Sequence, residues 1–541
     1  MLRIRTLIGF IAGAAASVAL AQSFHDAPAS AKTTKNPTSA ADGAKSGATL
    51  YDKNCSGCHG NKGEGAVDGP ALTAAAAKNA SDGELFWFIT HGSPADGMPA
   101  WESLPDTQRW QLVDFVRELQ TTPQNAPAKS PAKPPTAAVS TSGPFIDYRS
   151  ESPGATHKIT VSDLPQPYAT PSANNGPRLV KRPDGAMPKT KPGFKVELYA
   201  EGLEAPRLIR TAPNGDYFAA LTRADKIALF RGISADGKPD VVATFAEGLN
   251  KPFGIAFYPP GPNPKYIYIG NMDAVVRIPY QNGDLKARAT PEHILDLPHG
   301  RGHSTRDIQF SPDGKRMYVS VGSASNVDDP DTTPEEHHRA NILVVTPDGK
   351  DVNVFASGIR NAVGLAIQPK TGELWCSVNE RDGLGDNLVP DYITHVQENG
   401  FYGWPWWYIG LHQDPRLEGK HRELRSKVIV PDVLLQPHFA SLEMTFYDGK
   451  QFPADYAGDV FAAEHGSWNK STRAGYEVIR VPLHQSGKAS GDYEDFLTGF
   501  VLDNGDVWGR PVGVTVATDG SLLVTDDGSG SIWRVSYAGA H

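Results

Sequence analysis

The chain has 541 residues, which is enough for two or more domains with at least one sizeable core. Its 52 basic and 61 acidic residues give a formal charge of -9, which argues against the basic face of a nucleic-acid-binding protein. Only three cysteines occur, so a disulfide framework is excluded and the fold must be stabilised by its cores.

The N-terminus has the pattern of an export signal. Arg3 and Arg5 precede an apolar run, and Ala19, Leu20 and Ala21 form a small-x-small cleavage site. The run is shorter than the roughly 20 apolar residues of a spanning helix, so a retained membrane anchor is the weaker alternative. We therefore expect a cleaved signal peptide over residues 1–21 and a flexible segment over 22–45. The mature protein is expected to be periplasmic or secreted, with no membrane span.

The next segment holds two of the three cysteines. In "NCSGCHGNKGEG", Cys55, Cys58 and His59 form a C-x-x-C-H motif, which in an exported chain is typical of covalent c-type haem attachment. The two thiols would bond to the haem vinyl groups, and His59 would coordinate the iron. A thioredoxin-like redox pair is the alternative, but it needs a strand before the motif and a longer α/β region after it.

A second axial ligand is expected later in this domain. Met98 lies in "HGSPADGMPAW", and His/Met ligation raises the haem reduction potential. His91 is a weaker candidate, and a core methionine is the structural alternative for Met98. Apolar residues at helical spacing in "PDTQRWQLVDFVRELQ" predict a closing helix. Residues 46–121 resemble a class I cytochrome c, which implies a small all-α domain with covalent haem c.

The composition changes after this domain. Residues 122–180 begin with "TTPQNAPAKSPAKPPTAAVSTSGP", which is rich in Pro, Ala, Ser and Thr and has no hydrophobic period. Such a composition is typical of a semi-extended linker. The later part of this segment is expected to run along the surface of the domain that follows.

The remainder, residues 181–541, repeats a unit of loop, apolar strand, turn and alternating strand. The units begin near Glu201, Glu247, His303, Ser357, Leu442 and Gly509. Their spacing allows four strands per unit, which predicts an all-β six-bladed β-propeller. A sandwich with long loops is the alternative. A propeller would carry its function on the loops around one end of the central channel.

Basic and amide side chains recur at the starts of these units. They are His299, Arg301, His303 and Arg306 in "HGRGHSTRDIQF", the Arg360-Asn361 pair, Lys470 and Arg473 in "EHGSWNKSTRAGYEV", and Arg510. Because equivalent loops of a propeller converge on the channel, these groups predict an anion-binding pocket at its mouth. A surface salt bridge is the alternative role for any single arginine.

Residues from about 192 to 537 resemble the soluble quinoprotein sugar dehydrogenases, a family that includes glucose (aldose), L-sorbosone and pyranose dehydrogenases. The matching motifs, in order, are "GHSTRDIQFSPDGK", "SGIRNAVGLA", "VNERDGLGDNLVPDYI" followed by "NGFYGWPWW", "EHGSWNKSTRAGYEV" and "GRPVGV". The resemblance implies a propeller that holds pyrroloquinoline quinone (PQQ) and calcium and oxidises a sugar.

The resemblance also implies roles for single residues. His303 falls on the catalytic base, and Arg360 with Asn361 falls on the pair beside the quinone carbonyls, where a fixed cation stabilises developing charge. The carboxylates of PQQ would be held by Lys470 or Arg473 and by Arg510, and Asn250 lies near an amide position. Backbone carbonyls around Arg381 and Asp382 would complete the calcium shell, although the glucose dehydrogenase branch has Gly-Pro there.

These expectations combine into one function. A periplasmic quinohaemoprotein dehydrogenase would oxidise an aldose or sorbosone-type sugar by hydride transfer to PQQ. It would then pass electrons singly through the haem to a cytochrome, a cupredoxin or a quinone-linked oxidase. The tether keeps the haem at high effective concentration. A calcium-dependent lactonase-type hydrolase and a non-catalytic propeller that docks a redox partner remain as alternatives.

Overall fold

The computed structural model describes residues 27–28, 30–37, 40–55, 59, 62–63, 71–73, 75–92, 101–102, 104–121, 143–484 and 486–539. The chain forms two compact units, residues 1–129 and 130–541. The predicted signal peptide, Cys58 and Met98 lie outside the described residues. Among the helices that are described, none is long and apolar enough to cross a membrane.

The first unit is helical. Its elements are η2 (Ala31–Thr33), α1 (Ala40–Asn54), α3 (Ala75–Asn79), α4 (Asp82–His91) and α5 (Asp106–Thr121). Helix α4 begins with a capping box, in which Ser81 and Glu84 each bond the other's backbone N–H. Helix α5 confirms the predicted closing helix. It packs against α1, and both contribute to a core that contains Tyr51, Leu85, Ile89, Trp110, Leu112, Val113 and Val116.

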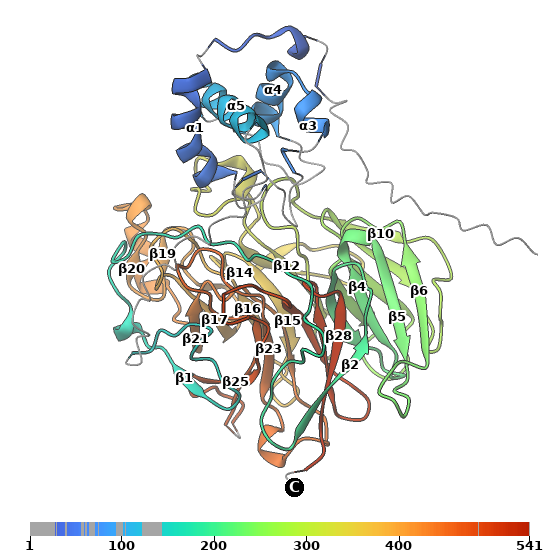
Figure 1. Cartoon of the computed structure of the whole chain (residues 1–541). Coiled ribbons are helices and arrows are strands. Elements are labelled where there is room, and N and C mark those ends of the chain that lie inside the picture. The colour runs from blue at the N-terminus through green and yellow to red at the C-terminus, as the bar shows by residue number, and fades with distance from the viewer. Residues whose placement is uncertain are drawn as a thin grey trace, which may run out of the picture. The chain divides into compact units, whose positions relative to one another are not determined.

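The described part of the second unit contains six blade sheets, one for each predicted repeat, and a seventh, two-stranded sheet; the six blades confirm the propeller (Figure 1). Blade 1 is β3 (Pro206–Thr211), β4 (Tyr217–Leu221), β5 (Lys226–Arg231) and β6 (Val241–Glu247). Blade 2 is β7 (Gly254–Tyr258), β8 (Tyr266–Gly270), β9 (Ala274–Pro279) and β10 (Glu292–Asp296). Blade 3 is β11 (Ile308–Phe310), β12 (Met317–Val321), β13 (Asn341–Val345) and β14 (Asn353–Ser357), extended by β18 (Gly400–Phe401).

Blades 4 to 6 follow the same antiparallel pattern. Blade 4 is β15 (Ala362–Ile367), β16 (Leu374–Val378), β17 (Pro390–His395) and β21 (Val433–Pro437), with the hairpin β19 (Trp407–Tyr408) and β20 (His412–Gln413) inserted before β21. Blade 5 is β22 (Ser441–Phe446), β23 (Val460–Glu464), β24 (Glu477–Val481) and β25 (Asp492–Leu497), extended by β1 (Thr156–Lys158). Blade 6 is β26 (Pro511–Val516), β27 (Leu522–Asp526), β28 (Ser531–Tyr537) and β2 (Phe194–Ala200).

The ring is closed by strands from both ends of the propeller sequence. Strand β2 pairs antiparallel with β28, with Phe194 opposite Tyr537. The first strands of successive blades also contact one another in a closed series, from β3 through β7, β11, β15, β22 and β26 back to β3. Closure removes the free sheet edge that an open array would expose.

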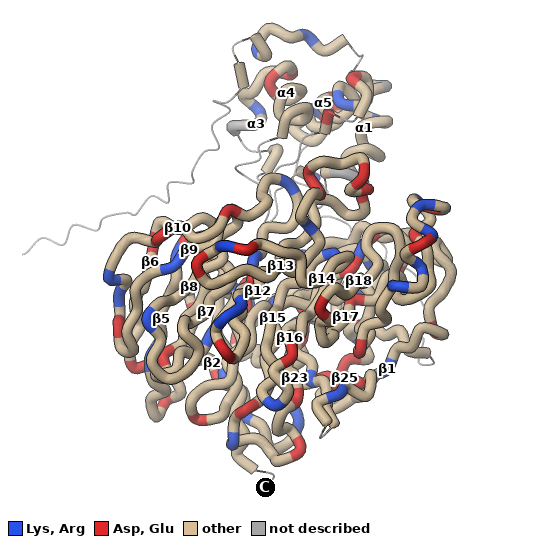
Figure 2. Tube along the Cα trace, turned by 180° about the vertical axis from the view of Figure 1, so that it is seen from behind, with Lys and Arg blue, Asp and Glu red and all other residues tan. Residues whose placement is uncertain are grey.

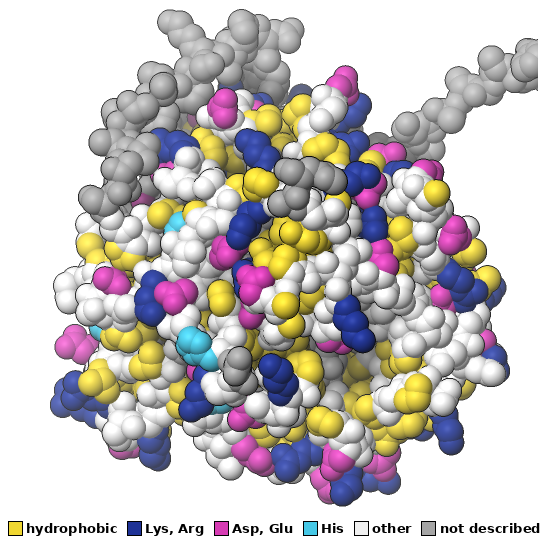
Figure 3. Space-filling model, turned by 90° about the horizontal axis from the view of Figure 1, so that it is seen from below, with side chains coloured by type: hydrophobic (Ala, Val, Ile, Leu, Met, Phe, Trp, Pro, Cys, Tyr) yellow, Lys and Arg dark blue, Asp and Glu magenta, His cyan; other side chains and the backbone are white. Residues whose placement is uncertain are grey.

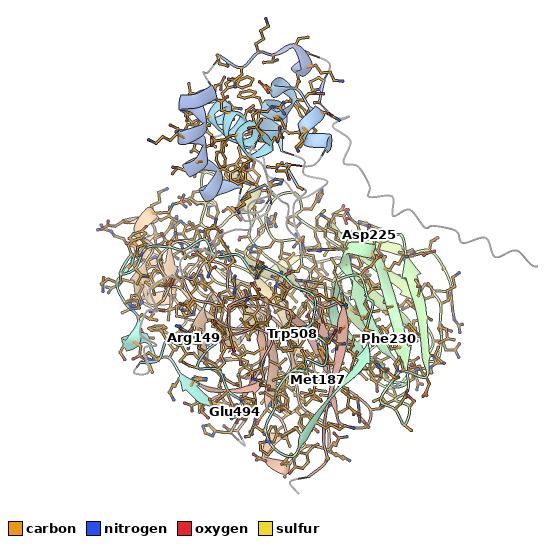
Figure 4. All side chains as sticks on the ribbon, viewed as in Figure 1. Arg149, Met187, Asp225, Phe230, Glu494 and Trp508 are labelled. Atoms are coloured by element: carbon orange, nitrogen blue, oxygen red, sulfur yellow. The ribbon has the colours of Figure 1, made fainter. Side chains whose placement is uncertain are left out.

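Residues 143–190, here called the strap, lie along blades 4 to 6. Strand β1 of the strap pairs with β25, and bridges join Ile159 to Leu434 and Leu179 to Val507. Just after the strap, Lys191 donates to Glu494 of β25 over 2.9 Å. Figure 4 labels Glu494, together with Arg149 and Met187 of the strap. The later part of the 122–180 segment is therefore packed against the propeller.

An ion triad lies inside the ring of first strands. The guanidinium of Arg210 in β3 pairs with Asp307, which precedes β11, at 2.8 Å, and with Glu443 in β22. Both carboxylates are fully buried. They also accept backbone N–H groups, from Leu365 to Asp307 and from Ile209 to Glu443. These bonds tie four blades together at the centre of the channel.

The two ends of the channel differ. At the end where the first strands finish, a hollow of about 700 Å³ is lined by residues that include Arg210, Gln309, Phe446, Lys450 and Thr518. Figure 3 views the molecule from below, with hydrophobic side chains mixed among charged ones. Lys and Arg are also interspersed with Asp and Glu along the propeller in Figure 2.

Candidate active site

The sequence-predicted site residues gather at the end of the channel where the first strands begin. His303 and Arg306 precede β11, the Arg360-Asn361 pair precedes β15, and Arg510 precedes β26. Since neighbouring strands run antiparallel, the loops after β12, β16, β23 and β27 return to this same end. They carry Ser323, Arg381 with Asp382, Lys470 with Arg473, and Asp527. The fold therefore brings segments 220 residues apart to one mouth.

His303 is half-buried at this mouth, and one of its ring nitrogens is hydrogen-bonded to Ser323. Its Nδ1 lies 3.0 Å from the carbonyl oxygen of Ser323 and 3.1 Å from the Ser323 hydroxyl. A carbonyl oxygen can only accept, so Nδ1 carries the proton and donates it. The lone pair is then on Nε2, which is the atom that could take a proton from a ligand hydroxyl.

The surroundings of His303 favour its neutral form. Loss of hydration, and next the positive charge of Arg360, lower the pKa of His303 well below its usual range. The ring is therefore unprotonated at neutral pH. A neutral imidazole with its lone pair on Nε2 can accept a proton from a ligand hydroxyl, which is the role of a general base.

Two arginines hold the backbone of His303. The carbonyl oxygen of His303 accepts from Arg306 Nη1 at 3.0 Å and from Arg339 Nη2 at 2.6 Å. Arg306 also donates to the carbonyls of Thr305 and Pro298 and is fully buried. These bonds show that Arg306 supports the loop, although its buried Nε has no hydrogen-bond partner. Arg339 was missed because nothing in the sequence relates it to His303 before β12 and β13 pair.

Asn361 lies directly beside His303. Both side chains approach Gly322. A Cβ added to this glycine would lie 2.1 Å from Asn361 Oδ1 and 2.7 Å from the Cβ of His303. Asn361 Nδ2 donates to Asn379 Oδ1 at 3.2 Å, whereas the buried Asn361 Oδ1 has no hydrogen-bond partner. A buried orphan acceptor is costly unless a ligand satisfies it.

Arg360 is held in one orientation by its neighbours. Nε donates to the Asn326 carbonyl, Nη2 to Asn326 Oδ1 and Nη1 to the Glu380 carbonyl, over 2.8 to 3.1 Å. The carboxylate of Asp382 lies 3.7 Å from Nη2. Because most of its hydrogen bonds go to backbone oxygens, the guanidinium keeps a net positive charge beside His303.

The loop that contains Arg381 and Asp382 was expected to hold calcium. Asp382 pairs with His438 at 3.0 Å, and its carbonyl accepts from Asn326 Nδ2. Arg381 forms a buried pair with Asp414 at 3.0 Å. Among the described residues, no group of three metal-ligating side chains comes together. The side chains of Arg381 and Asp382 are thus engaged with other residues. The expected calcium ligands are backbone carbonyls and cofactor oxygens, so the calcium site stays a prediction.

Lys470 and Arg473 have different surroundings, which separates two candidates that the sequence left equivalent. All three nitrogen positions of the Arg473 guanidinium donate to backbone carbonyls, those of Gly505, Asn175 and Gly176, so Arg473 anchors the strap. Lys470 donates to the Asp386 carbonyl and to Asn387 Oδ1. Burial lowers the pKa of Lys470 to about 8. Of the two, Lys470 is therefore the better candidate for an incoming anion, because the Arg473 side chain serves as an anchor of the strap.

Arg510 also has an unsatisfied donor at the mouth. Its Nη2 lies 2.8 Å from Nδ1 of His465, and its buried Nε has no hydrogen-bond partner. His465 belongs to the "EHGSW" stretch and was not singled out from the sequence. The Arg510 Nε donor fits an anionic ligand such as PQQ, whereas the orphan Oδ1 of Asn361 requires an N–H or O–H donor from a ligand.

Two further candidates contribute less. Asn250 is half-buried before blade 2, and its carbonyl oxygen accepts from the Met272 N–H. In the tryptophan group, Trp404 and Trp407 are buried. Trp406 is half-buried and donates to Asp329. Packing is therefore the main role of these rings.

In the helical unit, Cys55 directly follows α1. The His59 N–H donates to the Cys55 carbonyl at 2.9 Å, which puts both residues on one turn, and His59 is buried. Cys55 also packs against the apolar core formed with α5. A thiol and an imidazole on one turn beside an apolar core fit covalent haem attachment; the positions of Cys58 and Met98 are not described.

Comparisons with known proteins agree with this architecture. The family model described as "Glucose / Sorbosone dehydrogenase" matches residues 203–467, and a "TrAA12-like" model matches residues 412–538. The model described as "Cytochrome C oxidase, cbb3-type, subunit III" matches residues 42–116, which covers the C-x-x-C-H motif.

Individual relatives match the propeller. An uncharacterised protein of Borreliella burgdorferi is 30% identical over 363 residues, 64% of this chain and 90% of that protein. The "Pyrroloquinoline quinone-dependent pyranose dehydrogenase" of Coprinopsis cinerea is 26% identical over 298 residues, 43% of this chain, and the chain spans only 39% of that enzyme's length. The solved structure of the PQQ domain of a Coprinopsis cinerea pyranose dehydrogenase has a TM-score of 0.56 at 21% identity, covering 65% of this chain and 97% of that one.

The fold and site thus define a six-bladed propeller with a polar, cation-containing mouth, preceded by a small cytochrome c domain. The propeller contains a domain of the glucose/sorbosone dehydrogenase family, residues 203–467, and a cytochrome c domain lies on its N-terminal side.

Proposed function

We propose that this protein is a periplasmic quinohaemoprotein dehydrogenase that oxidises a sugar at the propeller mouth and exports the electrons through its haem. The observation that carries the proposal is the neutral His303, whose Nε2 lone pair is available beside the fixed cation Arg360 and the orphan Oδ1 of Asn361. An aldose or a sorbosone-type aldehyde is the proposed substrate class.

PQQ, when bound, would supply a two-electron acceptor for a hydride from the substrate carbon. Lys470 and Arg510 would hold it, because each has N–H donors suited to a carboxylate. Asn361 would contribute differently, because its orphan Oδ1 is an acceptor and needs an N–H or O–H group of the cofactor or substrate. Forked guanidinium pairing makes Arg510 the strongest of these for a carboxylate. Asn250 is a weaker candidate at the rim.

The chain's own contribution to the reaction is proton removal and charge placement. His303 Nε2 takes the proton of the hydroxyl on the reacting carbon, which is the anomeric hydroxyl of an aldose or a hydroxyl of the hydrated form of an aldehyde. The bond from Nδ1 to the Ser323 carbonyl holds the ring in position. Arg360 remains charged and oriented by Asn326 and Glu380, so negative charge that develops near it is stabilised without reorganisation. Oxidation of an alcohol releases one proton and two electrons with the hydride, and His303 accounts for the proton.

The cytochrome domain accounts for the electrons. Sugar oxidation releases two electrons together, whereas one haem accepts one at a time. Cys55 and Cys58 would attach haem c, with His59 and Met98 as axial ligands. A soluble cytochrome, a cupredoxin or a quinone-linked oxidase in the periplasm is the proposed acceptor.

The test uses the full-length, haem-loaded protein, oxidised and free of quinone. PQQ, calcium and a panel of aldoses and ketoaldoses are added, and reduction of the haem is followed by its absorbance. We expect reduction only when PQQ and a sugar are both present, and calcium is varied separately. A wild-type protein that neither binds PQQ nor reduces its haem would overturn the proposal and favour a lactonase or a docking propeller.

Two variants make the test specific. His303→Ala should abolish haem reduction while PQQ binding persists. His293→Ala is the matched control, because His293 is an exposed residue of the outer strand β10 that pairs only with Asp296. Equal loss in both variants would contradict a catalytic role of His303.

A further inference from the structure

Four polar side chains form a continuous series at the channel mouth. Arg207 Nη1 lies 2.8 Å from Asp527 Oδ2, and Asp527 Oδ1 lies 2.8 Å from His465 Nε2. His465 Nδ1 in turn lies 2.8 Å from Arg510 Nη2. The series joins β3, the loop after β27, the loop after β23 and the residue before β26, so it spans blades 1, 6 and 5.

The series has only one consistent direction of hydrogen bonding. A guanidinium has donors and no acceptor, so Nδ1 of His465 must accept from Arg510. The ring proton is then on Nε2 and is donated to the Asp527 carboxylate. His465 is therefore a neutral ring with a fixed tautomer, between an anion and a cation.

The same arrangement resists a second proton on His465. A proton on Nδ1 would point at the Arg510 guanidinium and remove the acceptor that holds it. The charged groups that face the ring are Arg510, Asp527 and Arg207, whereas the neighbouring Glu464 is turned to the Ser441 hydroxyl at 2.9 Å. Loss of hydration, and next Arg510, lower the pKa of His465 to about 4.

Arg510 is the member of the series with capacity for a ligand. One of its terminal nitrogens is engaged by His465, its backbone N–H donates to Asp526, and its buried Nε has no partner. An arginine with a free donor is useful to an anion only if its long side chain is held in place, since ordering it costs conformational entropy.

We propose that Asp527 and His465 are positioning residues that hold the Arg510 guanidinium for a carboxylate of the quinone cofactor. This inference rests on the proposed function. His465 acts as an acceptor for Arg510, and Asp527 fixes the tautomer that makes it one. Neither residue touches the reacting atoms, so their loss reduces cofactor affinity, and acidification has the same effect when His465 gains its second proton.

The test measures PQQ binding to full-length protein by isothermal titration calorimetry. His465→Leu removes the acceptor and is expected to weaken binding at pH 7 by about tenfold or more. His465→Gln keeps the arrangement, since the amide oxygen can accept from Arg510 and the amide nitrogen can donate to Asp527, and binding should stay within about threefold. His395→Gln is the matched control, because His395, the last residue of β17, pairs with Asp432 and does not belong to this series.

The pH profile separates positioning from a structural role. Between pH 6 and pH 4, wild-type affinity should fall more steeply than that of His465→Gln, which cannot be protonated; titration of PQQ itself affects both equally. Equal profiles, or a folded His465→Leu that binds like wild type, would overturn the inference while the proposed function stands. If His465→Leu does not fold, the inference is decided by comparing the pH profiles of PQQ affinity for wild type and His465→Gln. A wild-type protein that binds no PQQ would overturn both.

Discussion

Nδ1 of His303 and the carbonyl oxygen of Ser323 are 3.0 Å apart, and this contact decides which nitrogen of the ring can act as a base. The carbonyl can only accept, so it holds the proton on Nδ1 and leaves Nε2 with the lone pair. The Ser323 N–H in turn donates to the Arg360 carbonyl at 2.8 Å, which connects the base to the cation beside it.

The first prediction concerns the pH dependence of the reaction. Burial and Arg360 lower the pKa of His303 well below its usual range, so the neutral base persists as pH falls through 6.5. We expect kcat/KM, which reports the free enzyme, to show no acid limb near pH 6.5. An inflection at that pH, absent from a PQQ-binding titration, would contradict this assignment.

The second prediction concerns the close approach of His303 and Asn361. Gly322→Ala would place a Cβ 2.1 Å from Asn361 Oδ1, so the two side chains must separate. We expect a loss of about 100-fold in kcat/KM, since small displacements of positioned groups have effects of that order. Gly176→Ala is the control, because nothing lies within 4 Å of its added Cβ. Similar losses in the two variants would argue against a local cause.

The third prediction concerns the ion triad in the channel. Arg210→Met leaves the buried carboxylates of Asp307 and Glu443 without their cation. Removing one partner of a buried pair typically costs about 3–5 kcal/mol. Chemical denaturation should show a lower midpoint, partly restored when Asp307→Asn and Glu443→Gln are added. Arg288→Met, which removes a surface pair with Asp284, should leave the midpoint almost unchanged.

The fourth prediction concerns stability and pH. The pKa of His465 is lowered to about 4 in the folded chain, against about 6.5 when unfolded. The unfolded state therefore binds more protons as pH falls below 6.5, and the free energy of unfolding decreases. Between pH 7 and pH 5, where Asp527 stays ionised in both states, His465→Gln should lose about 2 kcal/mol less than wild type. The free energy of unfolding is measured by urea denaturation at each pH. If it changes with pH in the same way for wild type and His465→Gln, the buried neutral ring of His465 is contradicted.

The fifth prediction separates the two redox centres. Cys55→Ser combined with Cys58→Ser should eliminate covalent haem, seen as loss of the haem absorbance from denatured protein. Sugar oxidation followed with a one-electron dye should survive, because His303 and Arg360 belong to the second compact unit. Loss of dye-linked activity in a variant that still binds PQQ would show that the haem is required for the chemistry itself.

Local sequence patterns predicted the elements well. The repeats gave six blades in the observed order, and the apolar spacing in residues 105–120 predicted α5. These features are local, because strand and helix periodicities and turn residues depend on neighbouring positions. The surface course of the strap was expected, but the pairing partners of the strap and of strand β2 were not. Those partners lie about 340 residues away for both Phe194 and Ser152.

The candidate site shows the same division. The sequence by itself determined which residue types occur at the blade starts and, through family motifs, the expected roles of His303, Arg360 and Arg510. Only the tertiary structure decided that Arg306 and Arg473 donate hydrogen bonds to backbone carbonyls. It also decided that Arg339 supports His303, and that His465 and Asp527 hold Arg510. The physical reason is that an arginine's role depends on which acceptors surround its guanidinium, and in a closed propeller those acceptors come from other blades.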